Sequence, residues 1–314
     1  MLIFASGRTD IPAFYSEWFM NRVRAGFVDV RNPYYGEQVA RYKLTKDVVD
    51  CIVFCTKNPA PMLPHLDELK SFGLGLYFFV TITPYEKDVE ANVPPKSEVL
   101  DSFIELSRAL GIEKVCWRYD PIFVDSKYSV SFHIKAFRQM AEKLRGYSDR
   151  CIISFIDLYE KTKKNFPGVK EVSESDQKFL ASSLSRIGFE NGIKIESCAE
   201  KVDLTACGVE PGACVSREII EKASGTHLIQ KTGTSALRKH CLCLPTNDIG
   251  SYNSCPHLCK YCYANFNAKT VETLSNRHNP LSPFLIGEEE PGDKITERKM
   301  KSLKVSPIGQ LSMF

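Results

Sequence analysis

The stretch LGLYFFVTIT at residues 74–83 is a short apolar run rich in aromatic and β-branched side chains, and this composition predicts a strand. The same kind of run occurs five more times, with a polar stretch and a helical pattern between one run and the next. The other runs are LIFAS from residue 2, CIVFCT from 51, KVCWRY from 114, CIISFI from 151 and GIKIES from 192. Strands that alternate with helices predict an α/β fold with a parallel sheet.

Two weaker strand signals extend the six strands to eight. The seventh lies near THLIQ at residue 226, and the eighth is DIGSYN from residue 248. Eight such units close a (β/α)8 barrel of the TIM type. We therefore expect a barrel body over 1–247, a last strand with a cysteine loop over 248–265, and a tail rich in Pro, Gly and charge over 266–314. An open doubly wound sheet is the alternative, although no glycine fingerprint follows the first strand.

The composition is that of a globular protein with a large core. Of the 314 residues, 43% are hydrophobic and 25% charged, and the net charge of +3 neither demands nor excludes a nucleic-acid partner. No apolar stretch approaches the roughly 18 residues of a membrane span, and the first residues have the pattern of a strand rather than of a signal peptide. We expect a cytoplasmic protein in which the twelve cysteines serve metal or redox chemistry rather than disulfides.

Three of these cysteines fall within SCPHLCKYCYAN, residues 254–265. The C-x3-C-x2-C spacing lets one loop offer the thiolates of Cys255, Cys259 and Cys262 to three irons of a [4Fe–4S] cluster. The fourth iron is then open to a small molecule. A zinc site formed by the three cysteines and His257 is the alternative, although zinc sites usually pair C-x2-C with a distant second pair.

The cysteine loop resembles the cluster loop of the radical S-adenosylmethionine (SAM) superfamily, and DIGSYNSCPHLCKYCYAN is similar to spore photoproduct lyase and its relatives. The resemblance implies that the three cysteines hold the cluster, that SAM chelates the free iron, and that Tyr261 lies near the adenine. It implies further that an external donor supplies one electron and that SAM releases a 5′-deoxyadenosyl radical. That radical would abstract hydrogen from a substrate.

The whole chain resembles a bacterial family known as domain of unknown function 1848. The resemblance rests on SGRTDIPAFYSEWFMNRV, IVFCTKNPAPML, WRYDPI, ISFIDLY, ESCAE and the cysteine loop. The chain departs from the radical SAM pattern because its cysteine loop follows the last strand instead of the first, and because it contains no Gly-Gly pair. A circular permutation relative to radical SAM barrels accounts for the first departure, since DIGSYN then takes the usual first position beside LIFAS.

Four more cysteines lie near strand ends or in loops, where the ligands of barrels cluster: Cys198, Cys214, Cys241 and Cys243. Four thiolates suffice for a second iron–sulfur cluster or for zinc, and these positions match cysteines typical of the resembled family. The alternative is that the scattered cysteines are inert, and Cys207 is a substitute for any one of the four. The remaining cysteines lie in apolar runs and are expected to be small buried hydrophobes: Cys51, Cys55, Cys116 and Cys151.

Polar side chains follow the predicted strands, and in a barrel such residues face one shared mouth. The candidate catalytic residues are Arg8, Asp10, Lys57, Asn58, Thr83, Arg118, Asp120, Asp157, Glu196 and Glu200. Lys57 and Arg118 also suit a carboxylate or phosphate on SAM or on the substrate. The structural alternative is ion pairing within the barrel, or helix capping by Asp10, Asp120 and Asp157.

The chain ends in QLSMF, Gln310 to Phe314, which resembles the peptide by which bacterial repair proteins bind the sliding clamp. Together with the similarity to photoproduct lyase, this ending favours a nucleic-acid substrate over a small metabolite. The leading hypothesis is a radical SAM enzyme. The alternatives are an iron–sulfur binding or electron-transfer protein without radical chemistry, and a zinc-dependent hydrolase.

Overall fold

A sheet of eight parallel strands forms the centre of the chain, in the order β10-β1-β4-β5-β6-β7-β8-β9. The computed structural model describes residues 1–229 and 241–305. The strands are β1 (Leu2–Ala5), β4 (Cys51–Thr56), β5 (Gly75–Thr81), β6 (Val115–Ile122), β7 (Arg150–Phe155), β8 (Lys194–Ser197), β9 (Glu210–Pro211) and β10 (Asn247–Asp248). The six apolar runs of the sequence thus all form strands, and the predicted α/β class with a parallel sheet is confirmed.

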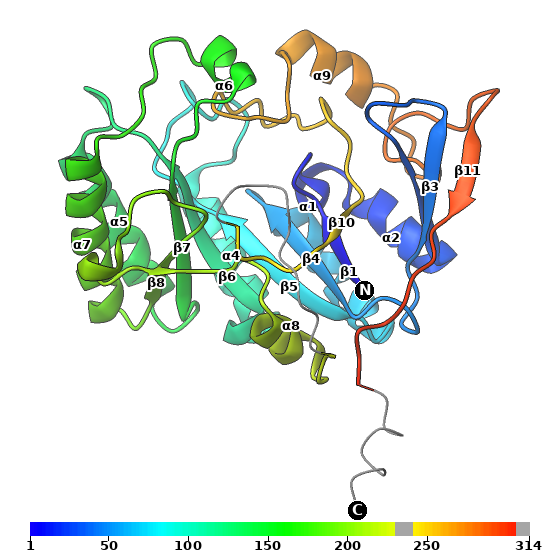
Figure 1. Cartoon of the computed structure of the whole chain (residues 1–314), viewed down its shortest axis with the longest axis horizontal. Helices are drawn as coiled ribbons and strands as arrows, with labels where there is room; N and C mark the ends of the chain where they lie inside the picture. Colours follow the sequence, from blue (N-terminus) through cyan, green and yellow to red (C-terminus); the bar gives the residue numbers. More distant parts are fainter. Residues whose placement is uncertain (230–240, 306–314) are drawn as a thin grey trace, which may run out of the picture.

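Helices pack against one face of this sheet, as Figure 1 shows for α4, α5 and α7. The α-helices are α1 (Ile11–Phe14), α2 (Ser16–Ala25), α3 (Leu66–Ser71), α4 (Lys96–Leu110), α5 (Val130–Leu144), α6 (Glu160–Asn165), α7 (Glu174–Glu190), α8 (Arg217–Ser224) and α9 (Ala268–Ser275). Short 3-10 helices occur at Ala60–His65, Ile112–Lys114 and Thr205–Cys207. None of the helices in the described part of the chain has the length and apolar character that crossing a bilayer requires.

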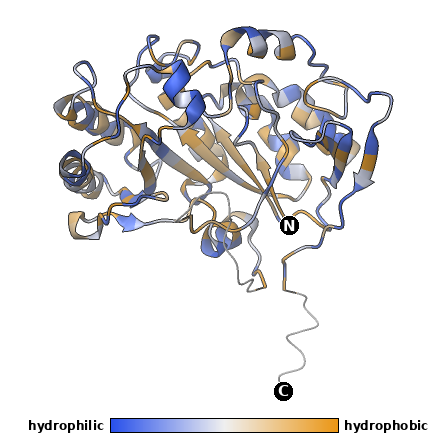
Figure 2. Cartoon of the chain, turned by 45° about the horizontal axis from the view of Figure 1, so that its top comes forward, coloured by the Kyte–Doolittle hydropathy of each residue, from blue (hydrophilic) through white to orange (hydrophobic). Residues whose placement is uncertain are grey.

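The central strands β4 and β5 are buried on both faces, which explains why their runs are continuously apolar rather than alternating. On the helix-covered face, Phe54 stacks on Phe78 at 4.3 Å between ring centroids, and Trp117 stacks on Phe137 of α5 at 4.5 Å. The opposite face carries a second apolar cluster that includes Val53 and Cys116. Figure 2 shows the strands as the most hydrophobic part of the chain, with polar residues concentrated on the outer helices and loops.

The closed barrel is not confirmed, because β9 and β10 are the two edges of an open sheet in the described residues. Each of these edge strands has two residues, too few to span a barrel wall. The face that carries the second apolar cluster, called the inner face below, is instead covered by α8 and its neighbouring segments. Val215, Ile220 and Leu228 of these segments belong to that cluster. Figure 1 accordingly shows α8 at one end of the sheet, opposite α6 and α9.

The seventh strand predicted near THLIQ is not found at residues 226–229. There Leu228 forms only an isolated bridge to Lys304, and Gln230 lies outside the described residues. The strand beside β8 is β9, which the sequence reading missed because a two-residue strand ending in proline has no apolar run.

The predicted neighbourhood of the first and last strands is confirmed. Ile3 of β1 is in register with Asn247 of β10, and Phe4 is in register with Asp248. The segment DIGSYN therefore begins at the edge of the sheet, directly beside LIFAS, although the two segments are more than two hundred residues apart in the sequence. This pairing places the loop that follows β10 at the carboxyl end of β1.

A smaller sheet in the order β11-β3-β2 lies beside the large one, with strands β2 (Phe27–Arg31), β3 (Gln38–Lys43) and β11 (Lys294–Glu297). Strand β11 comes from the region expected to be a tail, and it pairs in parallel with β3. The same region reaches the core, because the indole of Trp18 donates a 2.9 Å hydrogen bond to the carbonyl of Ser282. The clamp-like ending Gln310 to Phe314 lies outside the described residues.

Candidate active site

The cysteine loop, residues 254–265, lies over the carboxyl ends of the strands, because it follows β10 and pairs with the segment that follows β5. Lys260 donates its backbone N–H to the carbonyl of Val89 at 2.9 Å, and Asn92 donates its own to the carbonyl of His257 at 3.1 Å. Glu90 and Cys259 form a β-bridge between the two segments. Backbone pairing thus fixes the loop over β5 without requiring any bound group.

Asp10 fixes the same loop from the side of β1. One carboxylate oxygen accepts the backbone N–H of Ala13 at 3.0 Å and caps α1. The other oxygen accepts the backbone N–H of Lys57 at 2.7 Å and Nε2–H of His257 at 2.9 Å. Asp10 therefore joins the ends of β1 and β4 to the cysteine loop, and the structural alternative of helix capping also holds for it.

The edge between β1 and β10 is closed by a second carboxylate, that of Asp248. It accepts hydrogen bonds from Ser6 Oγ at 2.7 Å, from the Gly7 amide at 2.7 Å and from Arg8 Nε at 3.1 Å. The hydroxyl of Tyr263, one residue beyond the last cysteine, donates to the carbonyl of Gly7. Arg8 is thus beside the cysteine loop as expected, and its partner is Asp248.

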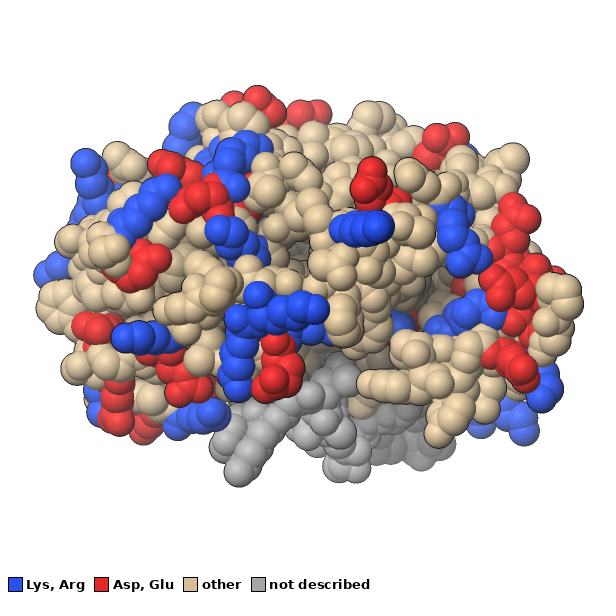
Figure 3. Space-filling model, turned by 90° about the horizontal axis from the view of Figure 1, so that it is seen from above, with Lys and Arg blue, Asp and Glu red and all other residues tan. Residues whose placement is uncertain are grey.

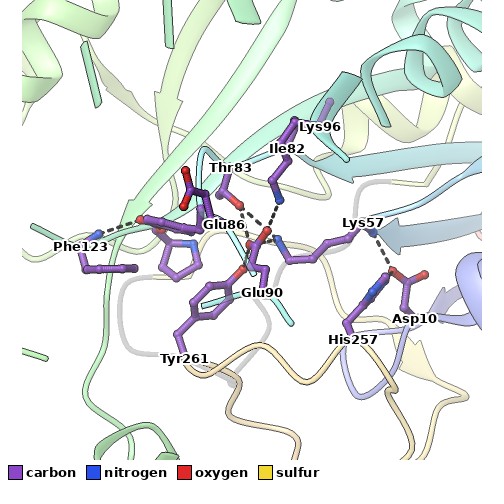
Figure 4. Close-up of polar contacts among 12 residues, drawn as sticks. Asp10, Lys57, Ile82, Thr83, Glu86, Glu90, Lys96, Phe123, His257 and Tyr261 are labelled. Atoms are coloured by element: carbon purple, nitrogen blue, oxygen red, sulfur yellow. Dashed lines mark hydrogen bonds and ion pairs between the residues drawn. The ribbon is translucent and has the colours of Figure 1, made fainter. Parts of the chain in front are cut away.

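Glu90 is the centre of a buried polar network beneath the cysteine loop (Figure 4). Its carboxylate accepts hydrogen bonds from Lys57 Nζ at 2.8 Å and from Thr83 Oγ1 at 2.6 Å. Lys96 Nζ and the hydroxyl of Tyr261 donate to it as well. Three of the residues predicted from the sequence, Lys57, Thr83 and Tyr261, therefore meet on one carboxylate.

Charge pairing keeps Glu90 ionised in this buried position. Burial would raise its pKa, but Lys57 and Lys96 lower that pKa to about 2. Burial lowers the pKa of Lys57, whereas the charges of Glu90 and Cys259 raise it, and the net change is upward. For Lys96, burial and the charge of Lys57 outweigh Glu90, so its pKa is lowered. The network carries more cationic than anionic side chains, which suits an added anionic group.

The three thiols of the cysteine loop suit a metal cluster by their chemistry. All three are free, and burial raises the pKa of each, that of Cys259 to about 12. The nearby charge of Lys57 lowers the pKa of Cys259, and the amide of Ala264 donates to Cys262 Sγ at 3.3 Å. The cation and the N–H···S contact offset only part of the effect of burial, so a bound metal would have to displace thiol protons.

The thiols do not converge on one point. Within residues 1–229 and 241–305, no three His, Cys, Asp or Glu side chains are arranged as ligands of a single metal ion. A four-iron cube is wider than one ion, so its thiolates lie farther apart than the ligands of zinc. His257 has one ring nitrogen, Nδ1, that is buried and without a hydrogen-bond partner.

Arg118 and Asp120 lie on β6, on the inner side of the sheet. A nitrogen of the Arg118 guanidinium donates to Asp120, which also accepts from Ser154 Oγ on β7. Burial would lower the pKa of Arg118, but Asp120 and the thiols of Cys214 and Cys55 hold it well above its usual range. Its Nε is buried and has no hydrogen-bond partner, which makes it a donor available to a ligand.

The other predicted residues lie apart from the Glu90 network. Glu196 pairs with Arg150 Nε at 2.5 Å and with Lys194 Nζ at 2.7 Å. Glu200 accepts the backbone N–H of Phe155 at 2.9 Å. The remaining two make local contacts, since Tyr159 donates to Asp157 at 3.3 Å and the Asn58 side chain accepts the amide of Ala60 at 3.2 Å.

The second set of predicted cysteines gathers on the inner face of the sheet. Cys198 and Cys214 are in contact, and the hydrogen bond between Cys214 and Cys243 lowers the pKa of Cys243. Cys241 interacts electrostatically with Cys243. Three chain segments thus bring these thiols together. As expected, Cys51, Cys116 and Cys151 are fully buried in strands, while Cys55 is only partly buried.

Sequence reading missed Glu90 and Lys96, the partners that complete the network. Both lie in the segment after β5, seven and thirteen residues beyond Thr83, whereas the sequence reading took only the first polar residues after each strand. A usable signal was present, because EKDVEANVPPK places acidic and basic residues between a strand and the proline-initiated helix α4.

The surface above the strand ends carries both signs of charge. In Figure 3, Lys and Arg side chains are intermixed with Asp and Glu on this face of the described residues, and neither sign forms a continuous field. None of the curated proteins matches the chain. One family model does match, over residues 2–264, and this span contains every strand of the large sheet and the whole cysteine triplet. The chain belongs to the family described as domain of unknown function DUF1848.

Proposed function

We infer that the chain is a radical SAM-type enzyme, with a [4Fe–4S] cluster on Cys255, Cys259 and Cys262 and SAM in the mouth formed by the strand ends. One observation carries the proposal: the cysteine loop is fixed directly over the buried Glu90 network, where Tyr261 and Lys57 meet. A loop used only to store metal needs no such network of ionised side chains beneath it. When bound, the cluster would supply one electron for reductive cleavage of SAM, and the resulting radical would act on a substrate not yet known.

The chain's own residues would bind and orient SAM. Lys57 and Lys96 carry two positive charges and share one carboxylate, that of Glu90. The remaining positive charge would attract the carboxylate of SAM. The Tyr261 ring, held through its hydroxyl by Glu90, would present a face to the adenine. Arg118 Nε is a buried donor without a partner, and it would take an acidic group of SAM or of the substrate.

The open sheet agrees with a permuted barrel that is left unclosed. In this proposal β10 corresponds to the first strand of a radical SAM barrel, because the cysteine loop follows it. Strand β1, which pairs with β10, then takes the next position. A nucleic-acid substrate would have to present its reacting base to this mouth out of the stack.

The test is anaerobic reconstitution with iron and sulfide, followed by reduction, addition of SAM and measurement of 5′-deoxyadenosine. We expect 5′-deoxyadenosine from the unchanged chain and none from Cys259→Ala. The matched control is Cys207→Ala, because Cys207 is a partly buried thiol outside the cysteine loop. A reconstituted cluster that does not cleave SAM, or cleavage that survives Cys259→Ala, contradicts the proposal.

A second candidate function, a zinc-dependent hydrolase, is favoured by the geometry of His257. Its Nε2–H is given to Asp10, and its Nδ1 is left as a free acceptor, which is how carboxylate-oriented histidines bind zinc. His257 Nδ1 and two of the three loop thiols would then hold one ion in place of a cluster and leave its fourth position open to the water that a hydrolase activates. Metal and acid-labile sulfide analysis of the anaerobically purified chain separates the two, because zinc without sulfide supports the hydrolase and iron with sulfide supports the radical enzyme.

A further inference from the structure

Cysteines from three distant parts of the chain meet on the inner face of the sheet, outside the cysteine loop. Cys198 follows β8, Cys214 follows β9 and Cys243 precedes β10. The Sγ atoms of Cys198 and Cys214 are 3.3 Å apart. Cys243 packs in the same apolar cluster as these two cysteines, and Cys241 is two residues away from it in the chain. Three cysteines therefore lie together on this face, with a fourth close by in sequence.

The contact with Cys214 and burial hold the pKa of Cys198 well above its usual range. The pKa of Cys214 is raised to about 12 despite its contact with Cys198, because of the Cys243 thiol and burial. Two nearby groups act in the opposite direction. The guanidinium of Arg118 is close enough to interact with Cys198 and Cys214. The backbone N–H of Val215 donates to Cys243 Sγ at 3.5 Å. Cysteines that serve only as small apolar fillers need neither a buried cation nor an N–H···S contact. Both features would stabilise thiolate ligands once a metal ion displaces the thiol protons.

The separation of the sulfurs identifies the kind of metal centre. Zinc–sulfur bonds of about 2.3 Å in a tetrahedron place neighbouring sulfurs about 3.8 Å apart. The 3.3 Å between Cys198 and Cys214 is near that separation and is too short for two thiolates bound to different irons of a cube. In contrast, no pair among the three thiols of the cysteine loop makes a sulfur–sulfur hydrogen bond within the described residues.

We propose that Cys198, Cys214, Cys241 and Cys243 form a second, structural metal site, which holds one zinc-like ion in a tetrathiolate centre separate from the cysteine loop. Cys198 and Cys214 are the preformed half of the site. The described residues present no three side chains as ligands of one ion, so Cys241 and Cys243 would complete the site by turning their side chains inward when the ion binds. Four thiols give up four protons to one divalent ion, and Arg118 offsets part of the net charge of −2 that results.

The proposed ion would lie where the sheet is open. It would tie the segment that precedes β10 to the ends of β8 and β9, across the inner face where α8 and its flanking residues replace barrel strands. A metal cross-link would there supply stability that strand pairing does not supply.

The experiment uses the full chain with Cys255, Cys259 and Cys262 all replaced by alanine, so that metal in the cysteine loop cannot contribute to the signal. This chain is loaded with zinc alone, freed of loose metal by gel filtration, and measured for zinc content and for its thermal midpoint with and without chelator. Cobalt loaded in place of zinc reports tetrahedral thiolate ligation by its absorption spectrum. Because the loop thiols are absent from this variant, failure of the SAM proposal leaves these readouts unaffected.

We expect about one zinc per chain, which falls about tenfold on adding Cys198→Ser or Cys214→Ser and is unchanged by the control Cys207→Ser. If either serine variant fails to fold, Cys243→Ser tests the same site at a partly exposed position. Zinc content that ignores all of these substitutions overturns the proposal. Iron with acid-labile sulfide at the site, in the chain reconstituted with both, also overturns it in favour of a second cluster.

Discussion

The carboxylate of Asp10 and the imidazole of His257 form a buried pair at 2.9 Å that joins the first strand of the sheet to the cysteine loop. The two residues are separated by 247 positions in the chain. Asp10 also caps α1 and accepts the Lys57 amide, so one side chain sets the relative positions of three elements of the site. Its position therefore determines where the three loop thiols stand relative to the Glu90 network.

Replacing Asp10 by asparagine tests this junction. The single oxygen of the amide can still accept from Lys57 and His257, but its NH2 group then faces the Ala13 amide that the lost oxygen capped, so a buried donor is left unsatisfied. We expect Asp10→Asn to lower the free energy of unfolding by about 1–3 kcal/mol, and to reduce the iron retained after reconstitution. Chemical denaturation and iron analysis measure the two effects. Asp101→Asn on the exposed face of α4 is the control, and equal behaviour of both variants contradicts the assigned role.

The pKa of Glu90 predicts an acid sensitivity of the folded chain. The folded-state pKa of about 2 lies below the ordinary 4.5, so the stabilisation it reflects is present above pH 4.5 and is lost as the pH falls toward 2. At about 1.4 kcal/mol per pH unit the loss amounts to about 3 kcal/mol. The unfolding free energy of the unchanged chain should therefore fall over this window, as measured by urea denaturation at a series of pH values.

Glu90→Gln should flatten that pH dependence, because glutamine does not titrate. At neutral pH this variant should be less stable by about 3–5 kcal/mol, since the partly buried Lys57 and Lys96 lose their counter-charge. Glu86→Gln is the control, because Glu86 is exposed and pairs with Lys127 outside the network. The same acid sensitivity in chains with and without the Glu90 carboxylate would show that another group is responsible.

Gly250 tests the contact between the last strand and the first. A Cβ atom at this position would overlap the hydroxyl of Ser6, whose hydrogen bond to Asp248 closes the sheet edge. We expect Gly250→Ala to destabilise the fold by about 1–3 kcal/mol, in the range of overpacking in cores. Gly36→Ala is the matched control, because nothing lies within 4 Å of the Cβ built there. Thermal unfolding measures both, and a stable Gly250→Ala would show that the edge tolerates displacement.

Glu196 was expected at the active site from its place after a strand, yet it pairs with Arg150 and Lys194. Burial would raise its pKa, but hydrogen bonds and charges from these two residues lower it. We expect Glu196→Gln to cost about 1–3 kcal/mol of stability because the buried Arg150 loses its partner. The yield of 5′-deoxyadenosine per cluster should stay the same. A loss of that yield with stability unchanged would return Glu196 to the list of catalytic residues.

The strands of the large sheet were predictable because burial on both faces leaves a continuous apolar run in the sequence. This holds for CIVFCT and for LGLYFFVTIT, both buried along nearly their whole length. The edge strands were harder, since β9 and β10 have two residues each and their pairing is decided by tertiary contacts. The prediction of a closed barrel was not confirmed for the same reason, because the number of apolar runs does not show whether two short edge strands pair with each other.

The candidate site was predictable where chemistry and spacing coincide. The cysteine triplet, Lys57, Thr83 and Tyr261 could be named from their places after strands. Glu90 could not, because a carboxylate in a long polar segment has no local sign that it turns inward to meet two lysines. His257 was named only as a metal ligand, and its bond to Asp10 depends on a contact across nearly the whole chain.

The pairing of β1 with β10 also sets the order of events during synthesis. Strand β1 emerges from the ribosome first, and the partner for its outer edge is Asn247–Asp248. At about 5–20 residues per second, that partner emerges some 10–50 seconds later. The unpaired edge is a hazard for association throughout that interval. The cysteine loop follows β10, so the proposed cluster could be assembled only after this interval.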